Sequence, residues 1–248
     1  MGKVPTSQSL SKNDVLIIVP AFNEQESINA VLTSLLDNDY QVLVVDDGSA
    51  DRTRIIAQEV GVDVLTLPFN LGVGGALRVG FKFAARHNYR AAVQIDADGQ
   101  HGVLQIIELI DHANETGAHL VLGSRFQRSD ESMKVPTMRR QVMRLLSKQA
   151  SRATGTPITD ATSGFHLIQE PLLSEFAKTF PVHYLGDTYE ALVSAGKADF
   201  TVREIPTVIV NRTHGTSTAS TIQSLKFIFK SVVAVSLGLN FRINKFIK

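Results

Sequence analysis

The chain has 248 residues, 44% of them hydrophobic, and 25 basic side chains nearly balance 24 acidic ones. This balance argues against a general nucleic-acid binder, and the absence of cysteine excludes disulfides and thiolate metal sites. No apolar run approaches about 18 residues, so we expect no membrane-spanning segment. Such a chain is typical of one large domain with at most a small appendage.

Strands and helices are expected to alternate through the first half of the chain. Continuous apolar runs predict buried strands at 15–19, 42–45, 62–67, 91–95 and 120–122. Apolar residues at helical spacing predict intervening helices at 28–36, 55–60, 76–83 and 103–113. This alternation predicts an α/β fold with a mostly parallel sheet. Residues 1–13 are expected to be a disordered lead-in.

The second half is less regular. Helices are expected at 136–153, 171–178, 185–195 and 222–239, with turn-rich loops at 160–165 and 211–217. A strand is expected over 200–210, and Pro206 within it favours a sheet edge or a bulge.

Polar clusters follow the carboxyl ends of four predicted strands. They are Asn23 with Glu24, Asp46 with Asp47, Asp96 with Asp98 and Gln100, and Arg125. In open α/β sheets this is the edge at which ligands bind. We therefore expect one site along this edge.

The cluster after residues 91–95 predicts a metal site. At a frayed strand end Asp96 and Asp98 point the same way, about 7 Å apart, and repel each other unless a cation lies near them. Oxygen ligands suit Mg²⁺ or Mn²⁺, commonly held by carboxylates together with substrate phosphates. The alternative is a solvated, Asp-rich turn.

Several motifs, in order, resemble family 2 glycosyltransferases of the GT-A fold. They are Val19–Glu24, Val45–Ser49, Asn70–Gly75 and the Asp-x-Asp motif Asp96–Asp98. Asp96–His101, Ser163–Phe165 and Arg212–Ser217 look most like the polyprenyl-phosphate sugar transferases, such as the dolichyl-phosphate mannose synthases. Two features depart from that group: Gly102 replaces a usual proline, and the C-terminal transmembrane helices of many members are absent.

The resemblance implies a GT-A catalytic domain over residues 14–218. Its core would be a single Rossmann-like, mostly parallel sheet flanked by helices. Residues 219–248 would follow as a basic amphipathic helix and tail.

The resemblance also implies an inverting, metal-dependent enzyme. It would move a monosaccharide from a UDP- or GDP-sugar to a polyprenyl phosphate; the alternative acceptor is a sugar hydroxyl in cell-envelope polysaccharide synthesis. Asp96, Asp98 and Gln100 would hold Mg²⁺ or Mn²⁺. The donor would contact Pro20, Ala21, Asn23, Glu24, Asp46, Asp47, Asp96 and Ala97.

Three arginines are the candidates for stabilising the leaving diphosphate, because guanidinium binds phosphate through two parallel hydrogen bonds. They are Arg125, Arg140 and Arg212. For Arg140 the alternative is a solvated basic helix face. Asp160 is expected either to be structural or to orient Arg140.

The acceptor decides whether a general base is needed. A phosphate monoester, with a second pKa of about 6, is already ionised near pH 7. A hydroxyl would need a carboxylate within hydrogen-bond reach, and Asp187 is the candidate. The alternative for Asp187 is a helix N-cap.

Other classes fit less well. Gly72–Gly75 follows the third strand, whereas a dinucleotide-binding loop follows the first. A nucleotidyltransferase needs a basic, glycine-rich loop where this chain has residues 20–24. A non-catalytic scaffold would not need Asp96, Asp98 and Gln100 together with Arg212.

The C-terminal residues suggest membrane contact. From Ile205 onward there is no acidic residue, and basic and apolar side chains are interleaved over 219–248. A helix of this kind can lie in the bilayer interface. The alternatives are packing on the core or docking onto a small membrane protein. We expect a cytoplasmic protein, peripheral at the inner face of the cell membrane.

Overall fold

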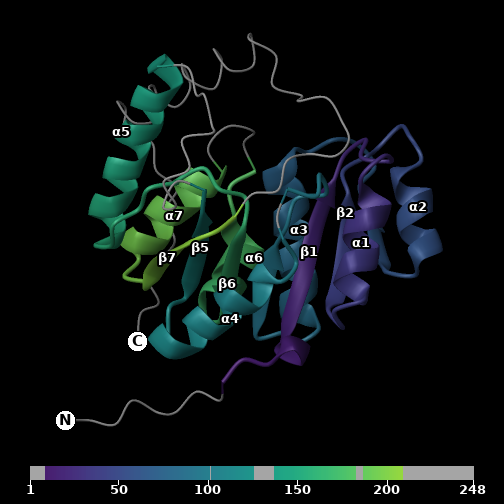
Figure 1. The fold of residues 1–248 in the computed structure, drawn as a ribbon, viewed down its shortest axis with the longest axis horizontal. Helices are drawn as coiled ribbons and strands as arrows, with labels where there is room; N and C mark the ends of the chain where they lie inside the picture. The colour runs from purple at the N-terminus through teal and green to yellow at the C-terminus, as the bar shows by residue number, and fades with distance from the viewer. Residues whose placement is uncertain (1–8, 101, 126–136, 183–186, 209–248) are drawn as a thin grey trace.

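The computed structural model describes residues 9–100, 102–125, 137–182 and 187–208, which form a three-layer α/β/α arrangement (Figure 1). The described part contains one seven-stranded sheet in the order β3-β2-β1-β4-β6-β5-β7. The strands are β1 Val15–Ala21, β2 Gln41–Asp46, β3 Asp63–Thr66, β4 Ala91–Gln94, β5 Leu120–Ser124, β6 His166–Gln169 and β7 Val202–Pro206. Neighbouring strands are parallel except that β6 is antiparallel to both β4 and β5. The mostly parallel sheet expected from the apolar runs is confirmed.

Helices cover both faces of this sheet. They are α1 Ile28–Leu36, α2 Thr53–Val60, α3 Val73–Arg86, α4 Gln105–Thr116, α5 Thr137–Thr154, α6 Leu172–Thr179 and α7 Asp187–Lys197. Side chains of α1, α2 and α4 pack on one face, and those of α3, α5, α6 and α7 on the other. On the second face Phe81, Phe176 and Phe180 are fully buried against one another. Burying each such ring contributes about 1.5–3 kcal/mol to folding.

Strand β6 was not expected from the sequence. It has four residues, of which only Leu167 and Ile168 are apolar, so its pattern is too short to predict a strand. Its pairing with β4 and β5, distant in the sequence, is what makes it a strand. Because β6 is antiparallel, the loop at 160–165 that precedes it lies at the edge where β2, β4 and β5 end.

Residues 1–13 were expected to be disordered, and this prediction is wrong for residues 9–13. Leu10 is 6% exposed, its N–H donates to Asn114 Oδ1 at 2.6 Å, and Asn114 Nδ2 donates back to the Leu10 carbonyl at 3.0 Å. A 3₁₀ turn at Lys12–Asp14 then leads into β1. The physical reason is that one apolar side chain and one paired amide fix the backbone on α4.

The last described strand, β7, lies at the edge of the sheet, as Pro206 led us to expect. The expected loop at 211–217 and the helix at 222–239 lie outside the described residues. Within the described ranges, none of the helices combines the length and apolar composition needed to cross a bilayer.

Candidate active site

Asn23 joins the loops that follow β1 and β2. Its N–H donates to Ser49 Oγ at 2.9 Å, and its Oδ1 accepts the Ala50 N–H at 2.9 Å. It adopts φ 56°, a left-handed conformation that asparagine tolerates better than most residues. The Glu24 N–H donates to Thr53 Oγ1 at 2.8 Å. Asn23 and Glu24, both expected to contact the donor, thus hold this rim of the sheet edge in place.

Asp46 is the last residue of β2 and Asp47 follows it, and both are buried. Asp46 Oδ1 accepts the Ser49 N–H at 3.1 Å. The two oxygens of Asp47 accept the N–H groups of Leu71 and Gly72 at 2.7 and 2.8 Å. Burial raises the pKa of Asp47, these two donors lower it in part, and the charge of Asp46 raises it further. Asp47 therefore anchors the glycine-rich loop at 70–75, a role not expected from the sequence.

Pro20 and Ala21 end β1, and the Ala21 carbonyl accepts the Asp47 N–H at 2.8 Å. Two aromatic rings on loops at the same edge are exposed: Phe22 by 46% and Phe69 by 63%. Neither ring was expected as a site residue. The available signal was the position of each phenylalanine within three residues of the end of a strand that reaches the ligand edge.

The Asp-x-Asp motif follows β4 as expected. Ala97 is buried in the core, whereas Asp96 and Asp98 on either side of it are only partly buried. Gln94 Nε2 donates to Asp96 Oδ1 at 3.4 Å, and the Gln100 N–H donates to Asp98 Oδ1 at 3.0 Å. The side chain of Ala97 therefore serves packing, which leaves only its backbone for the expected contact with the donor.

Gly164 lies directly against Asp96. A Cβ atom at this position would be 3.0 Å from both carboxylate oxygens of Asp96 and 3.1 Å from Gln94 Nε2. Glycine therefore lets the loop at 160–165 approach the Asp-x-Asp motif this closely without displacing the carboxylate of Asp96. Gly164 was not expected as a site residue, although its motif contributed to the resemblance.

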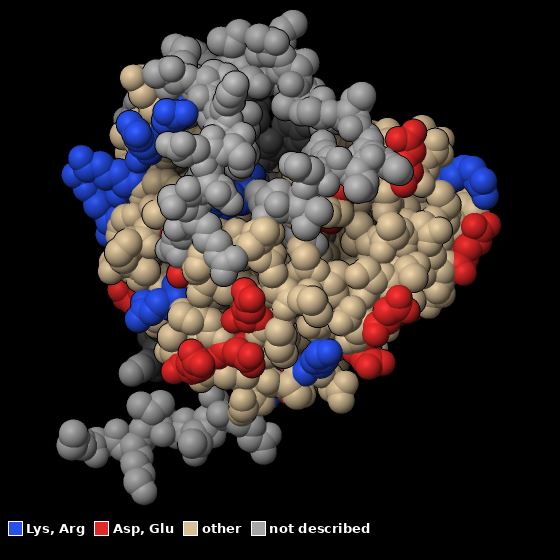
Figure 2. All heavy atoms as spheres, viewed as in Figure 1, with Lys and Arg blue, Asp and Glu red and all other residues tan. Residues whose placement is uncertain are grey.

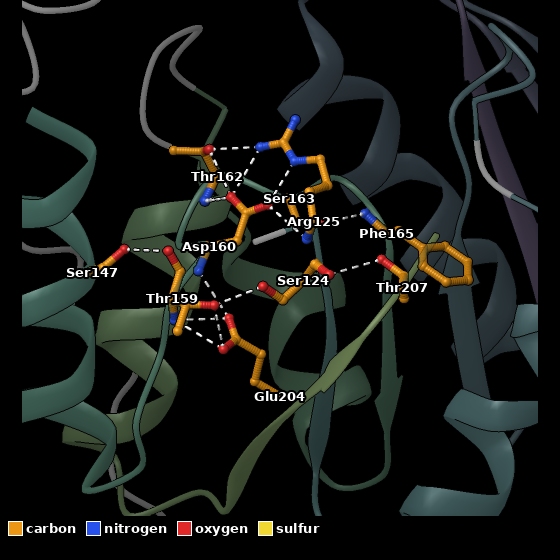
Figure 3. Close-up of polar contacts among 10 residues, drawn as sticks. All are labelled: Ser124, Arg125, Ser147, Thr159, Asp160, Thr162, Ser163, Phe165, Glu204 and Thr207. Carbon is orange, nitrogen blue, oxygen red and sulfur yellow. Dashed lines mark hydrogen bonds and ion pairs between the residues drawn. The ribbon is translucent and has the colours of Figure 1, made fainter. Parts of the chain in front are cut away.

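Arg125 follows β5 and binds Asp160 side-on (Figure 3). Its Nε donates to Asp160 Oδ2 at 2.6 Å, and Nη2 donates to Oδ1 at 2.9 Å and to Thr162 Oγ1 at 2.9 Å. The side chain of Asp160 is fully buried, and that of Arg125 is 25% exposed. Asp160 is thus the partner of Arg125. The expectation that it orients Arg140 is wrong, because both oxygens of its carboxylate bind Arg125.

Electrostatics keep Arg125 charged. Burial by itself would lower the pKa of its guanidinium, but the hydrogen bonds and charge of Asp160, with a further contribution from Asp96, raise that pKa above its ordinary value. The interaction with Asp96 also indicates that the cation after β5 and the carboxylate after β4 act on each other electrostatically. A cation held in place by Asp160 therefore lies at the same sheet edge as the Asp-x-Asp motif.

The remaining candidates are less completely described. Arg140 is exposed on α5, in line at four-residue intervals with Arg144, Lys148 and Arg152, which are also exposed. Asp187 is the first residue of α7, but its side chain lies outside the described part, as does all of Arg212.

The donor set at the Asp-x-Asp motif fits a hard divalent cation. Asp96, Asp98 and the amide of Gln100 offer only oxygen ligands, which suit Mg²⁺ or Mn²⁺. Among the described residues no three His, Cys, Asp or Glu side chains gather to hold a metal by themselves. A cation held by one or two carboxylates is commonly shared with substrate phosphates.

Sequence comparisons agree with this geometry. The model of glycosyl transferase family 2 matches residues 16–176. The polyprenol monophosphomannose synthase of Mycolicibacterium smegmatis is 28% identical over 225 residues, which cover 87% of this chain and 84% of that protein. The UDP-N-acetylglucosamine–dolichyl-phosphate N-acetylglucosaminyltransferase of Methanococcus voltae is 28% identical over 210 residues, covering 77% and 84% of the two chains.

A solved structure shares the fold. It is glucosyl-3-phosphoglycerate synthase from Mycobacterium tuberculosis in complex with Mn²⁺, UDP and glucosyl-3-phosphoglycerate. Its TM-score is 0.65 and its identity is 21%, with 90% of this chain and 78% of that chain covered. The fold expected from the sequence, of GT-A type, is confirmed. Since the family model also matches well over half of its residues, the chain belongs to glycosyl transferase family 2.

Proposed function

We propose that this enzyme is an inverting, metal-dependent transferase that moves a monosaccharide from a nucleoside-diphosphate sugar to a polyprenyl phosphate. The observation that carries the proposal is that Asp96 and Arg125 contact the same loop at one sheet edge, since Gly164 lies against Asp96 and Asp160 binds Arg125. A carboxylate pair for a cation next to a fixed guanidinium suits a substrate that carries several phosphate oxygens.

Each part of the edge has a proposed role. Asp96, Asp98 and Gln100 would hold Mg²⁺ or Mn²⁺ on the donor diphosphate. The exposed rings of Phe22 and Phe69 are further candidates for contact with the nucleobase of the donor. They add to the expected contacts of Asp46 and of the backbone at 20–21. When bound, the cation supplies positive charge where the leaving group becomes more negative.

The bond changes balance without a proton acceptor. An oxygen of the lipid phosphate attacks the anomeric carbon as the bond from that carbon to the diphosphate breaks, which inverts the configuration. The nucleoside diphosphate leaves with one more negative charge, while the acceptor phosphate loses one on forming a diester. Arg125, oriented by Asp160, would stabilise the leaving charge, and Arg140 and Arg212 are proposed to act on the same phosphates.

The choice of acceptor rests on the relatives. Two proteins that align over most of this chain carry polyprenol or dolichyl phosphate in their names. This supports a lipid phosphate acceptor over a sugar hydroxyl. With such an acceptor, Asp187 is not needed as a general base.

The lipid acceptor implies contact with a membrane, for which α5 is a candidate surface. Its exposed cations, Arg140, Arg144, Lys148 and Arg152, lie opposite its buried face, and the helix has no acidic residue. Figure 2 shows basic side chains gathered over this helix. Like charges four residues apart destabilise a helix by about 0.2–0.5 kcal/mol per pair, so helix stability does not explain this row. The expected membrane helix within 219–248 lies outside the described residues.

Vesicle binding tests this surface. Each cation near anionic lipid contributes about 1 kcal/mol, so the double variant Arg144→Glu, Lys148→Glu should bind phosphatidylserine vesicles at low salt at least ~10-fold more weakly. The matched control is the double variant Arg52→Glu, Arg54→Glu, which reverses the charge of two side chains at the start of α2. Equal vesicle binding by the two double variants would exclude α5 as the contact surface.

The metal assignment is tested by Asp98→Ala. This variant should unfold at nearly the temperature of the parent protein in the absence of ligands, because Asp98 is partly exposed and lies in a loop. It should lose the thermal stabilisation that Mn²⁺ with UDP or GDP gives the parent protein. Retained stabilisation at the same Mn²⁺ concentration would rule out the assignment.

A further inference from the structure

Glu204 binds the loop that carries Asp160. It lies in β7, where it is the register partner of Leu122 in β5. Its two carboxylate oxygens both accept the Thr159 N–H at 2.9 Å; one also accepts the Asp160 N–H and the other the Thr159 hydroxyl, each at 2.9 Å. One side chain thus holds two consecutive backbone amides.

The same turn is held from two further sides. Thr159 Oγ1 is 2.7 Å from Ser124 Oγ at the end of β5, and Ser147 Oγ of α5 donates to the Thr159 carbonyl at 2.8 Å. Figure 3 shows Glu204 below the turn and Arg125 above it, with Thr159 and Asp160 between them. The backbone of the turn is therefore fixed relative to β5, β7 and α5.

The orientation of Arg125 follows from this turn. Its Nε and Nη2 are used by Asp160, and the third nitrogen, Nη1, points away from Asp160 in Figure 3. A guanidinium is planar, so two parallel bonds to one carboxylate fix the plane and the direction of the third nitrogen. A shift of the turn at 159–160 would therefore rotate the guanidinium of Arg125.

The carboxylate of Glu204 matches the groups that the turn presents to it. Glu204 accepts the backbone N–H of Asp160, whereas the carboxylate of Asp160 points to the other side of the turn, toward Arg125 (Figure 3). The hydrogen bonds that Glu204 accepts from this turn come from backbone N–H groups and a hydroxyl. What a carboxylate provides here is acceptors alone, with no donor that would face an N–H group.

We propose that Glu204 is a positioning residue for Arg125, acting through Thr159 and Asp160. The inference rests on the proposed role of Arg125 at the donor diphosphate. Glu204 fixes the turn, the turn fixes the carboxylate of Asp160, and Asp160 sets the direction of the guanidinium. Glu204 itself does not touch the substrate in this scheme.

The test is a double-mutant cycle between Glu204→Gln and Arg125→Lys in the full chain. Glutamine keeps the shape but places an NH₂ group against the amides of the turn. Lysine keeps a cation for Asp160 but removes the planar fork, and it avoids an unpaired buried carboxylate. Sugar transfer to polyprenyl phosphate and slow donor hydrolysis are both measured with Mn²⁺, giving kcat and the donor KM for each variant.

Glu204→Gln is expected to lower kcat about 10–100-fold, because misplacing a group that acts in the transition state costs rate more than binding. In the Arg125→Lys background the same substitution should change kcat less than about 2-fold. Thr159→Val, which removes only the hydroxyl bonded to Glu204 and Ser124, should lower kcat in the same direction by a smaller factor. Thr159→Val replaces Glu204→Gln in the test if Glu204→Gln does not fold.

Asp14→Asn is the matched control. Asp14 also accepts a backbone N–H and a hydroxyl, both from Ser11, at 2.8 and 2.6 Å. It precedes β1, however, and so lies at the edge of the sheet opposite the candidate site. It should lower the unfolding temperature without changing kcat.

Two results would overturn the inference: an unchanged kcat in folded Glu204→Gln, or equal losses in both backgrounds, which would leave Glu204 a purely structural role. Failure of the proposed function is distinguishable, because the lipid would then receive no sugar while the cycle could still be read from donor hydrolysis.

Discussion

Replacing Gly164 by alanine should weaken metal binding through Asp96. The new Cβ would lie 3.0 Å from both oxygens of Asp96, whereas ordinary contacts begin near 3.4 Å. The carboxylate or the loop must therefore move by about 0.4 Å. Metal–oxygen distances in protein sites are defined to about 0.2 Å, so the required shift is about twice that tolerance.

The size of the effect follows from comparable changes. Altering a group that supports a metal ligand typically costs 10–100-fold in metal affinity or activity. We expect the Mn²⁺ concentration for half-maximal donor hydrolysis to rise by about that factor, with kcat largely recovered at saturating Mn²⁺. Overpacking should also lower the free energy of unfolding by about 1–3 kcal/mol, as measured by urea titration.

Gly102→Ala is the control for this prediction. Its Cβ would lie no closer than 3.5 Å to Gln105, which is ordinary contact, although Gly102 is also near the Asp-x-Asp motif. The metal dependence of this variant should be unchanged. If Gly164→Ala shows the same Mn²⁺ dependence as Gly102→Ala, the reasoning about contact with Asp96 is refuted.

Two further predictions concern the acceptor and pH. With a lipid phosphate acceptor, Asp187→Asn should keep transfer activity within a few-fold and Arg212→Ala should lose most of it; collapse of turnover in folded Asp187→Asn would favour a hydroxyl acceptor. Burial lowers the pKa of His119, whose Nδ1 accepts the Thr201 N–H at 3.1 Å. The unfolded chain then binds the proton more tightly, so the free energy of unfolding should fall as pH drops below about 6.5. His119→Asn, which can accept the same bond, should show a smaller fall between pH 7 and 5; an equal fall would contradict this assignment.

The parallel strands were predictable because burial on both faces leaves a local pattern. Val15 to Val19 is continuously apolar, and each of these residues is at most 2% exposed. Strand β6 leaves no such pattern, since its pairing with β4 and β5 depends on residues far away in the sequence. Residues 9–13 were misjudged for a related reason: the partner that fixes Leu10 is Asn114.

The candidate site divides in the same way. Asp96, Asp98 and Arg125 were predicted as site residues because each lies within three residues of the end of a predicted strand. The pairing of Arg125 with Asp160 joins residues 35 positions apart, and no local pattern indicates it. In the sequence Glu204 is indistinguishable from an ordinary polar residue of an edge strand, because its hydrogen bonds are to a loop 45 residues away.

The central claim is sugar transfer to a lipid phosphate, and one measurement tests it most directly. Radiolabelled UDP- and GDP-sugars are incubated with the full-length protein, polyprenyl phosphate and Mn²⁺, and the label extracted into organic solvent is counted. The account predicts a labelled lipid with one of these donors, its loss on chelation of Mn²⁺, and its loss in Asp98→Ala. Donor consumption that labels a hydroxyl acceptor and leaves the lipid unlabelled would contradict it.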